Sequence, residues 1–218
     1  MYGHVRACKG TKGAPWERAK LLAVRQIYSA GFTVIELLIT IAIAVILAST
    51  AIPSFRDFMF NNRAVSCINE FVAAANIARD EAVKRGAPVT VCSSSSPQAN
   101  NPTCDGGQQW ESGWILFADY DRDANMDLGA GACLTEEDCL LHVWDGFDDM
   151  TLRANPTRIT FDSTGASQGF QGTWRLCDAR GAQDARAVVL SPGGRVRTAQ
   201  DTDGDGIPED GGGNISCP

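Results

Sequence analysis

Histidine is scarce in this chain, with two residues among 218, His4 and His142. A Ser-His-Asp triad, a Cys–His pair or a paired-histidine metal site needs a well-placed histidine, and His142 lies inside a predicted strand, where a structural role is expected. The eight cysteines include no C-x-x-C pair, the usual signature of zinc or thioredoxin-like chemistry. The glycine-rich C-terminal tail lacks the lysine of a phosphate-binding loop. These absences indicate a protein that is not an enzyme and requires no cofactor.

Basic residues gather at the N-terminus and acidic residues in the remainder. Residues 1–31 hold six Lys and Arg against one acid, whereas the rest of the chain holds 13 basic and 25 acidic residues, a formal net charge of −12. An acidic domain repels phosphate, which argues against broad, non-specific nucleic-acid affinity. A single local basic patch remains compatible with this charge.

A long apolar run follows the basic segment. About 20 nearly uncharged residues begin at Phe32, a length that lets a helix cross a bilayer. Residues 1–31 have neither the long apolar core nor the small-x-small cleavage box of a Sec signal peptide, and their charge favours a cytoplasmic N-terminus. One acid, Glu36, interrupts the run near its start. A carboxylate in hydrocarbon costs about 2.5–3.5 kcal/mol on insertion scales, so Glu36 requires a specific reason.

The spacing Gly31-Phe32-Thr33-x-x-Glu36 before an apolar helix resembles the signal of type IV prepilins and type II secretion pseudopilins. The resemblance implies that a prepilin peptidase cuts between Gly31 and Phe32 and methylates the new N-terminus. It also implies that Glu36 pairs with the N-terminal amine of a neighbouring subunit. The implied location is the bacterial inner membrane, crossed once, with the C-terminal domain in the periplasm until the subunit joins a pilus or pseudopilus. The alternatives are an ordinary signal anchor with a stray acid and, for the leader, a start near Val24.

The sequence predicts one long helix followed by short strands, an α+β fold. Pro53 divides the helix into a transmembrane, assembly half and an amphipathic half, which Gly86 and Pro88 end. Eight β-rich runs without intervening helices favour antiparallel sheets. These runs cover residues 89–92, 114–118, 140–144, 151–153, 158–161, 173–177, 185–190 and 195–197. The predicted segments are a leader (1–31), two helix halves (32–53 and 54–85), a β domain (86–200) and an acidic tail (201–218).

Motifs in the helix and strands are similar to those of the GspH/FimT family of minor pilins. They are Asn61-Asn62-Arg63, the segment 78–85, Trp110-x-x-Gly113-Trp114-Ile115-x-Phe117-x-Asp119, Ile159-Thr160-Phe161-Asp162-x-x-Gly165, Leu176-Cys177-Asp178 and Gly194-Arg195-Val196-Arg197. The resemblance implies a type IV pilin-like fold and pilin or pseudopilin partners bound through the helix. The implied function is a minor pilin that helps initiate or cap a type IV pilus. The alternatives are the H-type pseudopilin of type II secretion and a pilus-associated DNA receptor for natural transformation.

Seven cysteines follow Cys8 of the leader, a density typical of an oxidising compartment. Six are candidate disulfide residues: Cys92, Cys104, Cys133, Cys139, Cys177 and Cys217. Spacing favours the pairs Cys92–Cys104 and Cys133–Cys139, each of which closes a short polar loop. Cys177–Cys217 would then tie the tail to the domain, and other connectivities stay open. Cys67 is left over on the helix, where we expect a small buried hydrophobe. The cysteines at 92, 104, 177 and 217 are more similar to those of the type IV pilus members than to those of the secretion members.

Two acidic runs have the spacing of oxygen ligands for a hard cation. In the tail, Ca²⁺ is expected to bind Asp201, Asp203, Asp205, the Ile207 carbonyl and Glu209 or Asp210. This run resembles the Asp-x-Asp-x-Asp-Gly calcium loops of extracellular repeats, and a solvated acidic tail is its alternative. The run from Asp119 to Asp127 is similar but has no glycine at the bend, and a polar loop after a strand is its alternative.

Arg195 and Arg197 form the one candidate basic pair for nucleic acid. Alternation along a strand places both on the same face. In family members proposed to take up DNA, the Gly-Arg-x-Arg element is implicated in backbone binding, so the resemblance makes DNA a candidate partner. Two arginines give a weak, salt-dependent contact, and strand-edge charges without a ligand are the alternative.

Overall fold

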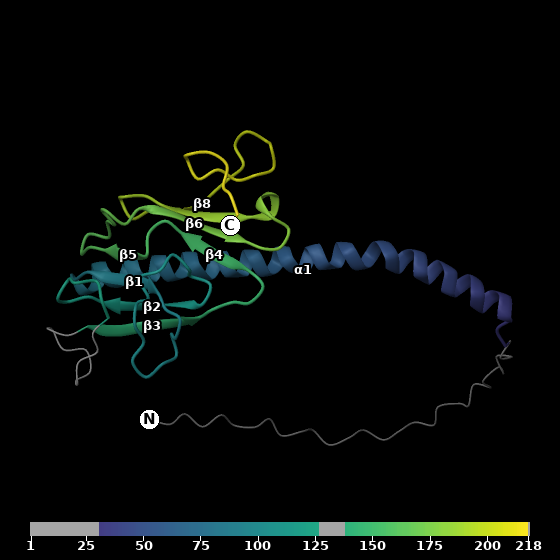
Figure 1. The fold of residues 1–218 in the computed structure, drawn as a ribbon, viewed down its shortest axis with the longest axis horizontal. Helices are drawn as coiled ribbons and strands as arrows, with labels where there is room; N and C mark the ends of the chain where they lie inside the picture. Colours follow the sequence, from purple (N-terminus) through teal and green to yellow (C-terminus); the bar gives the residue numbers. More distant parts are fainter. Residues whose placement is uncertain (1–30, 127–137, 218) are drawn as a thin grey trace, which may run out of the picture. The chain divides into compact units, whose positions relative to one another are not determined.

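The computed structural model describes residues 31–126 and 138–217 of the chain. The chain divides into two units, one ending at Ala48 and the other beginning at Ser49. One long helix, α1 (Val34–Arg85), contributes to both units. Every strand belongs to the second unit, where the later part of α1 is accompanied by two sheets (Figure 1).

Thr33 caps the start of α1. Its Oγ1 accepts a hydrogen bond from the Glu36 backbone N–H at 3.3 Å, and its carbonyl accepts one from the Leu37 N–H at 3.1 Å. The helix therefore begins at Val34, whereas the sequence predicts Phe32. Pro53 lies inside α1, which continues through it. Gly86 follows the last helical residue with φ 65°, the left-handed conformation that commonly ends helices.

In residues 31–126 and 138–217, eight strands form two antiparallel sheets of four strands each. The strands are β1 (Val89–Ser93), β2 (Gly113–Ala118), β3 (Cys139–Asp145), β4 (Thr151–Ala154), β5 (Arg158–Phe161), β6 (Gly172–Cys177), β7 (Arg186–Leu190) and β8 (Val196–Thr198). The first sheet has the order β3-β2-β1-β5 and the second has the order β4-β6-β7-β8. Each strand matches a predicted run to within one residue at either end, and the predicted α+β fold is confirmed.

Phe71 of α1 lies where the helix meets both sheets. Its ring centroid is 5.6 Å from those of Trp110 and Trp114 and 5.3 Å from that of Trp174. Trp114 belongs to β2 in the first sheet and Trp174 to β6 in the second. All four aromatic side chains are buried, with exposures of 1 % or less. One helical side chain thus joins the two sheets into one core.

Small side chains let α1 approach the sheets closely. The alanines of its buried face are Ala64, Ala74, Ala75, Ala78 and Ala82. Val72, on the same part of the helix, is only partly buried. Cys67 lies on this face as a free thiol with 7 % exposure, as expected for a small buried hydrophobe.

Two disulfides between described residues bind loops to the sheets. Cys92 and Cys104 are joined with a Cα separation of 5.5 Å, and Cys177 and Cys217 with a separation of 5.8 Å. Both are pairs that the spacing favours. The third pair, Cys133–Cys139, lies partly outside the described residues because Cys133 is not among them.

Candidate functional site

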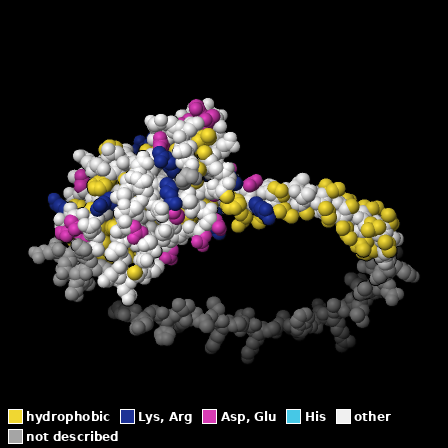
Figure 2. Space-filling model, viewed as in Figure 1, with side chains coloured by type: hydrophobic (Ala, Val, Ile, Leu, Met, Phe, Trp, Pro, Cys, Tyr) yellow, Lys and Arg dark blue, Asp and Glu magenta, His cyan; other side chains and the backbone are white. Residues whose placement is uncertain are grey.

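The first unit, described from Gly31, is an exposed apolar helix segment. α1 is the one helix of the described residues that is long and apolar enough to cross a membrane, with a hydropathy of 2.5 in its apolar window, none of which is buried. Phe32 is 81 % exposed and Val34 is 77 % exposed. Figure 2 shows apolar side chains covering this part of the helix. Such a large apolar surface is typical of a helix that lies in lipid or packs against other apolar helices.

Glu36 can act in capping the start of α1 or in pairing its carboxylate with a cation, and the local structure bears on the first of these roles. With Thr33 it forms the sequence of a capping box, in which the acid bonds back to the cap residue. Only one half is formed, because the Thr33 hydroxyl accepts the Glu36 N–H, whereas no bond of the Glu36 carboxylate occurs among residues 31–126 and 138–217. The Thr33-x-x-Glu36 spacing in the sequence is itself a signal for the start of a helix.

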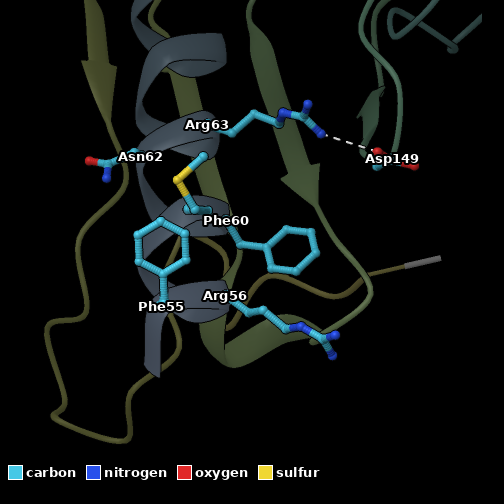
Figure 3. A pocket seen from close by; sticks show the side chains of 7 residues that line it. Phe55, Arg56, Phe60, Asn62, Arg63 and Asp149 are labelled. Carbon is cyan, nitrogen blue, oxygen red and sulfur yellow. Dashed lines mark hydrogen bonds and ion pairs between the residues drawn. The ribbon is translucent and has the colours of Figure 1, made fainter. Parts of the chain in front are cut away.

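An apolar pocket of about 610 Å³ lies on α1 within the second unit (Figure 3). Its lining residues are Phe55, Arg56, Met59, Phe60, Asn62, Arg63 and Asp149. Arg63 forms an ion pair with Asp149 at 3.1 Å, which closes one side. Phe55 and Met59 remain more than half exposed, at 63 % and 53 %. The pocket therefore offers apolar surface beside a charged rim, a combination suited to a protein partner.

Arg180 fixes the neighbouring part of α1 to the second sheet. Its guanidinium lies 5.5 Å from the Phe60 ring centroid and donates to Asn61 Oδ1 at 3.1 Å. The same group pairs with Asp178 at 2.6 Å and with Asp184 at 3.1 Å. Burial acts to raise the pKa of Asp178, but the hydrogen bonds and the positive charge of Arg180 together outweigh burial and hold this pKa below its usual value. Sequence reasoning missed this cluster because Arg180 and Asn61 are 119 residues apart.

The tail acids predicted to bind Ca²⁺ come together only in part. Carboxylate oxygens of Asp201, Asp203 and Glu209 lie within 4.8 Å of one another. The Asp201 carboxylate accepts the N–H groups of Gly204 and Gly206 at 2.7 and 2.8 Å. All three acids thus belong to one turn of the tail, and calcium binding there stays a prediction.

The remaining predicted ligands have other partners. Asp210 forms an ion pair with Arg175 at 2.8 Å, and that arginine helps hold the pKa of Asp210 low against the opposing effect of burial. Asp205 accepts hydrogen bonds from the Asn214 amide and from the Ile207 N–H. Neither acid lies in the group formed by the other three.

Arg195 and Arg197 are both exposed, at and just before the edge strand β8. Gly194 before them has φ 75°, and a Cβ added there would collide with the Gly165 carbonyl. The glycine of this motif is therefore required by the turn itself. The acidic tail lies close to Arg197, since a Cβ at Gly211 would be 3.6 Å from its guanidinium.

We expect weak DNA binding by this surface. Two arginines near an acidic tail support at most about two phosphate contacts, so the logarithm of the affinity should fall with that of the salt concentration with a slope no steeper than about −2. A gel shift with the full chain in detergent, at several salt concentrations, measures this slope. Tight binding that Arg195→Ala/Arg197→Ala abolishes, and that Arg153→Ala leaves intact, would make DNA uptake the leading function.

The family model described as type II transport protein GspH matches residues 68–194, more than half of the chain. The chain therefore belongs to the GspH family, which confirms the resemblance that its motifs suggest.

Two solved structures are similar to the chain, both of the type IV minor pilin FimU from Pseudomonas aeruginosa strain PAO1. The crystal form in space group P65 has 19 % identity and a TM-score of 0.44, covering 62 % of this chain and 91 % of FimU. The form in space group P21 has 20 % identity and a TM-score of 0.46, covering 66 % and 92 %. No curated protein matches the chain significantly.

Proposed function

We propose that the protein is a minor pilin, a low-copy subunit that helps initiate or cap a type IV pilus. The observation that carries this proposal is the exposed apolar part of α1, with the single acid Glu36 placed four residues after Phe32. Such a helix is stable in a bilayer because its backbone groups are satisfied internally. It is equally suited to packing among other apolar helices, which is what a filament core provides.

Prepilin peptidase is the proposed processing enzyme, acting between Gly31 and Phe32. Both residues are exposed and precede the helix, which begins at Val34. Cleavage there would create an amine at Phe32, a cation of the kind that the Glu36 carboxylate of a neighbouring subunit requires. The subunit would sit in the inner membrane with its second unit in the periplasm until assembly.

The pocket beside Phe55 and Met59 is the proposed contact of the second unit with a neighbouring pilin. Burying two such side chains stabilises an association by about 1.5–3 kcal/mol each at most. The Arg63–Asp149 ion pair at its side adds orientation rather than much energy, because both side chains are more than half exposed, at 54 % and 71 %.

A type II secretion pseudopilin is the second candidate, because the matching family model is described as a type II transport protein. The physical argument for the helix is the same in both machines. The two disulfides favour the pilus, because their cysteines are more similar to those of pilus members of the family.

Deletion of the gene, followed by complementation, tests the proposal. We expect loss of surface pili with normal protein secretion, and we expect the complementing protein in sheared pili with methylated Phe32 as its first residue by mass spectrometry. Loss of secretion with normal piliation would favour the pseudopilin. A protein that keeps Gly31, or that never enters a filament, would reject both.

A further inference from the structure

Three carboxylates meet in the loop that follows β2, here called the β2 loop (residues 119–126). Asp119, Asp121 and Asp123 each place one oxygen within 4.8 Å of the others. Oxygens that bind one Ca²⁺ at about 2.4 Å lie at most about 4.8 Å apart, so this spacing fits a shared ion. The lack of a glycine is no obstacle, because Arg122 and Ala124 adopt φ values of 66° and 60°, which glycine usually supplies.

Asp119 differs from the exposed acids of the tail because it is buried, with 1 % exposure. Its Oδ2 accepts a hydrogen bond from the Thr90 hydroxyl at 3.2 Å. Its Oδ1 has no hydrogen-bond partner among the residues that the structure describes. A buried carboxylate oxygen without a partner destabilises a fold, and a bound cation would be that partner.

The β2 loop contains one basic residue, Arg122, whose side chain is exposed. Among the described residues no ion pair joins these acids to a lysine or arginine, and Arg158 instead donates to the Ala124 carbonyl at 2.6 Å. Another buried acid, Asp138, lies against the loop and accepts the Tyr120 N–H at 3.3 Å. Asp119, Asp121 and Asp123 thus share one small region without an ion pair among the residues that the structure describes.

We propose that the β2 loop binds one Ca²⁺ ion through Asp119, Asp121 and Asp123. Asp121 and Asp123 are already positioned, because they accept the N–H groups of Asp123 and Asn125 at 3.1 and 2.7 Å. The loop ends at Met126, which packs in the cluster of Cys92 on the first sheet. An ion would therefore fix the loop onto the sheet next to a disulfide. Three carboxylates, two of which are exposed, predict an affinity like that of extracellular calcium modules, about 10⁻⁴–10⁻³ M.

Calorimetry with Ca²⁺ on the full chain in detergent, after treatment with chelator, tests this site. Because Asp121 and Asp123 are exposed, an Asp121→Asn/Asp123→Asn variant should keep the fold, which circular dichroism checks. We expect it to bind Ca²⁺ at least about tenfold more weakly than the wild type. The matched control is Asp201→Asn/Asp203→Asn in the tail, which should leave this binding unchanged.

Asp119→Asn separates an ion ligand from a merely structural acid. The amide is the same size and can still accept the Thr90 hydroxyl, so a structural role would survive the change while ion binding would be lost. We expect Asp119→Asn to fold and to lose Ca²⁺ binding at the β2 loop. If Asp119→Asn does not fold, the Asp121→Asn/Asp123→Asn variant tests the proposal in its place. The proposal is overturned if the wild type gives neither heat nor a higher Tm at millimolar Ca²⁺. It is also overturned if Asp119→Asn combined with Asp201→Asn/Asp203→Asn still binds Ca²⁺, or if Asp201→Asn/Asp203→Asn alone abolishes binding.

Discussion

A Glu36→Ala substitution is expected to reduce incorporation of the protein into filaments by about 100-fold or more, because breaking a buried ion pair costs about 3–5 kcal/mol. Without Glu36, the N-terminal amine of a neighbouring subunit would be buried among apolar helices with no partner. Insertion into the membrane should become easier, since the one acid of the apolar run is gone. The measurement is the ratio of the protein in sheared filaments to that in membranes.

Two matched variants distinguish the charge of Glu36 from its place at the start of α1. Glu36→Gln keeps the size and the capping ability but loses the charge, and it should be as defective as Glu36→Ala. Thr33→Val removes the hydroxyl that accepts the Glu36 N–H and keeps the charge, so it should cost only about 1 kcal/mol of helix stability and leave incorporation near normal. Normal incorporation of Glu36→Gln would show that the carboxylate acts in helix capping and not in assembly.

A Cys177→Ser/Cys217→Ser variant is expected to lower the free energy of unfolding by about 4 kcal/mol, from the chain entropy released by opening a loop of this length. The sequence separation of these cysteines is 40, compared with 12 for Cys92 and Cys104. For a chain of this size the Tm should fall by roughly 10 °C. Thermal unfolding followed by circular dichroism measures the shift, and reducing agent added to the wild type should lower its Tm at least as far.

Two controls test whether the loss arises from the long loop. Opening the shorter Cys92–Cys104 loop should cost less, about 3 kcal/mol in the same chain-entropy model. Cys67→Ala, which removes a thiol that is not bridged, should alter neither the disulfides nor the response to reducing agent. A Tm within about 2 °C of the wild type for Cys177→Ser/Cys217→Ser would mean that the tail is held by its other contacts, such as buried Ile215.

Strand positions could be predicted because their signals are local. The run from Trp114 to Ala118 is apolar throughout, and all of β2 is buried, as a central strand covered on both faces requires. The start of β7 shifts from Ala185 to Arg186 because a short 3-10 helix, Ala182–Asp184, ends against it. The pairing of the strands into two sheets could not be predicted, because it depends on contacts between distant segments.

The candidate sites divide in the same way. The Gly31 to Glu36 signal is contiguous and could be found from sequence, whereas the ion pair of Arg175 with Asp210 joins residues 35 positions apart. The glycines of the tail favoured a cation site there over the β2 loop. The structure favours the β2 loop instead, because Asp119 is buried and its Oδ1 has no hydrogen-bond partner among the described residues. The spacing of the acids in the sequence does not reveal this packing.

The contact of Phe71 with three tryptophans has a mechanical consequence. A pull along the axis of α1 would reach the first sheet through Trp114 and the second through Trp174 at the same time. The helix cannot slide along its axis without withdrawing Phe71 from both sheets, so the two sheets should separate from the helix together. The second unit should therefore resist traction as a single body and yield in one step, a property suited to the filament subunit that we propose.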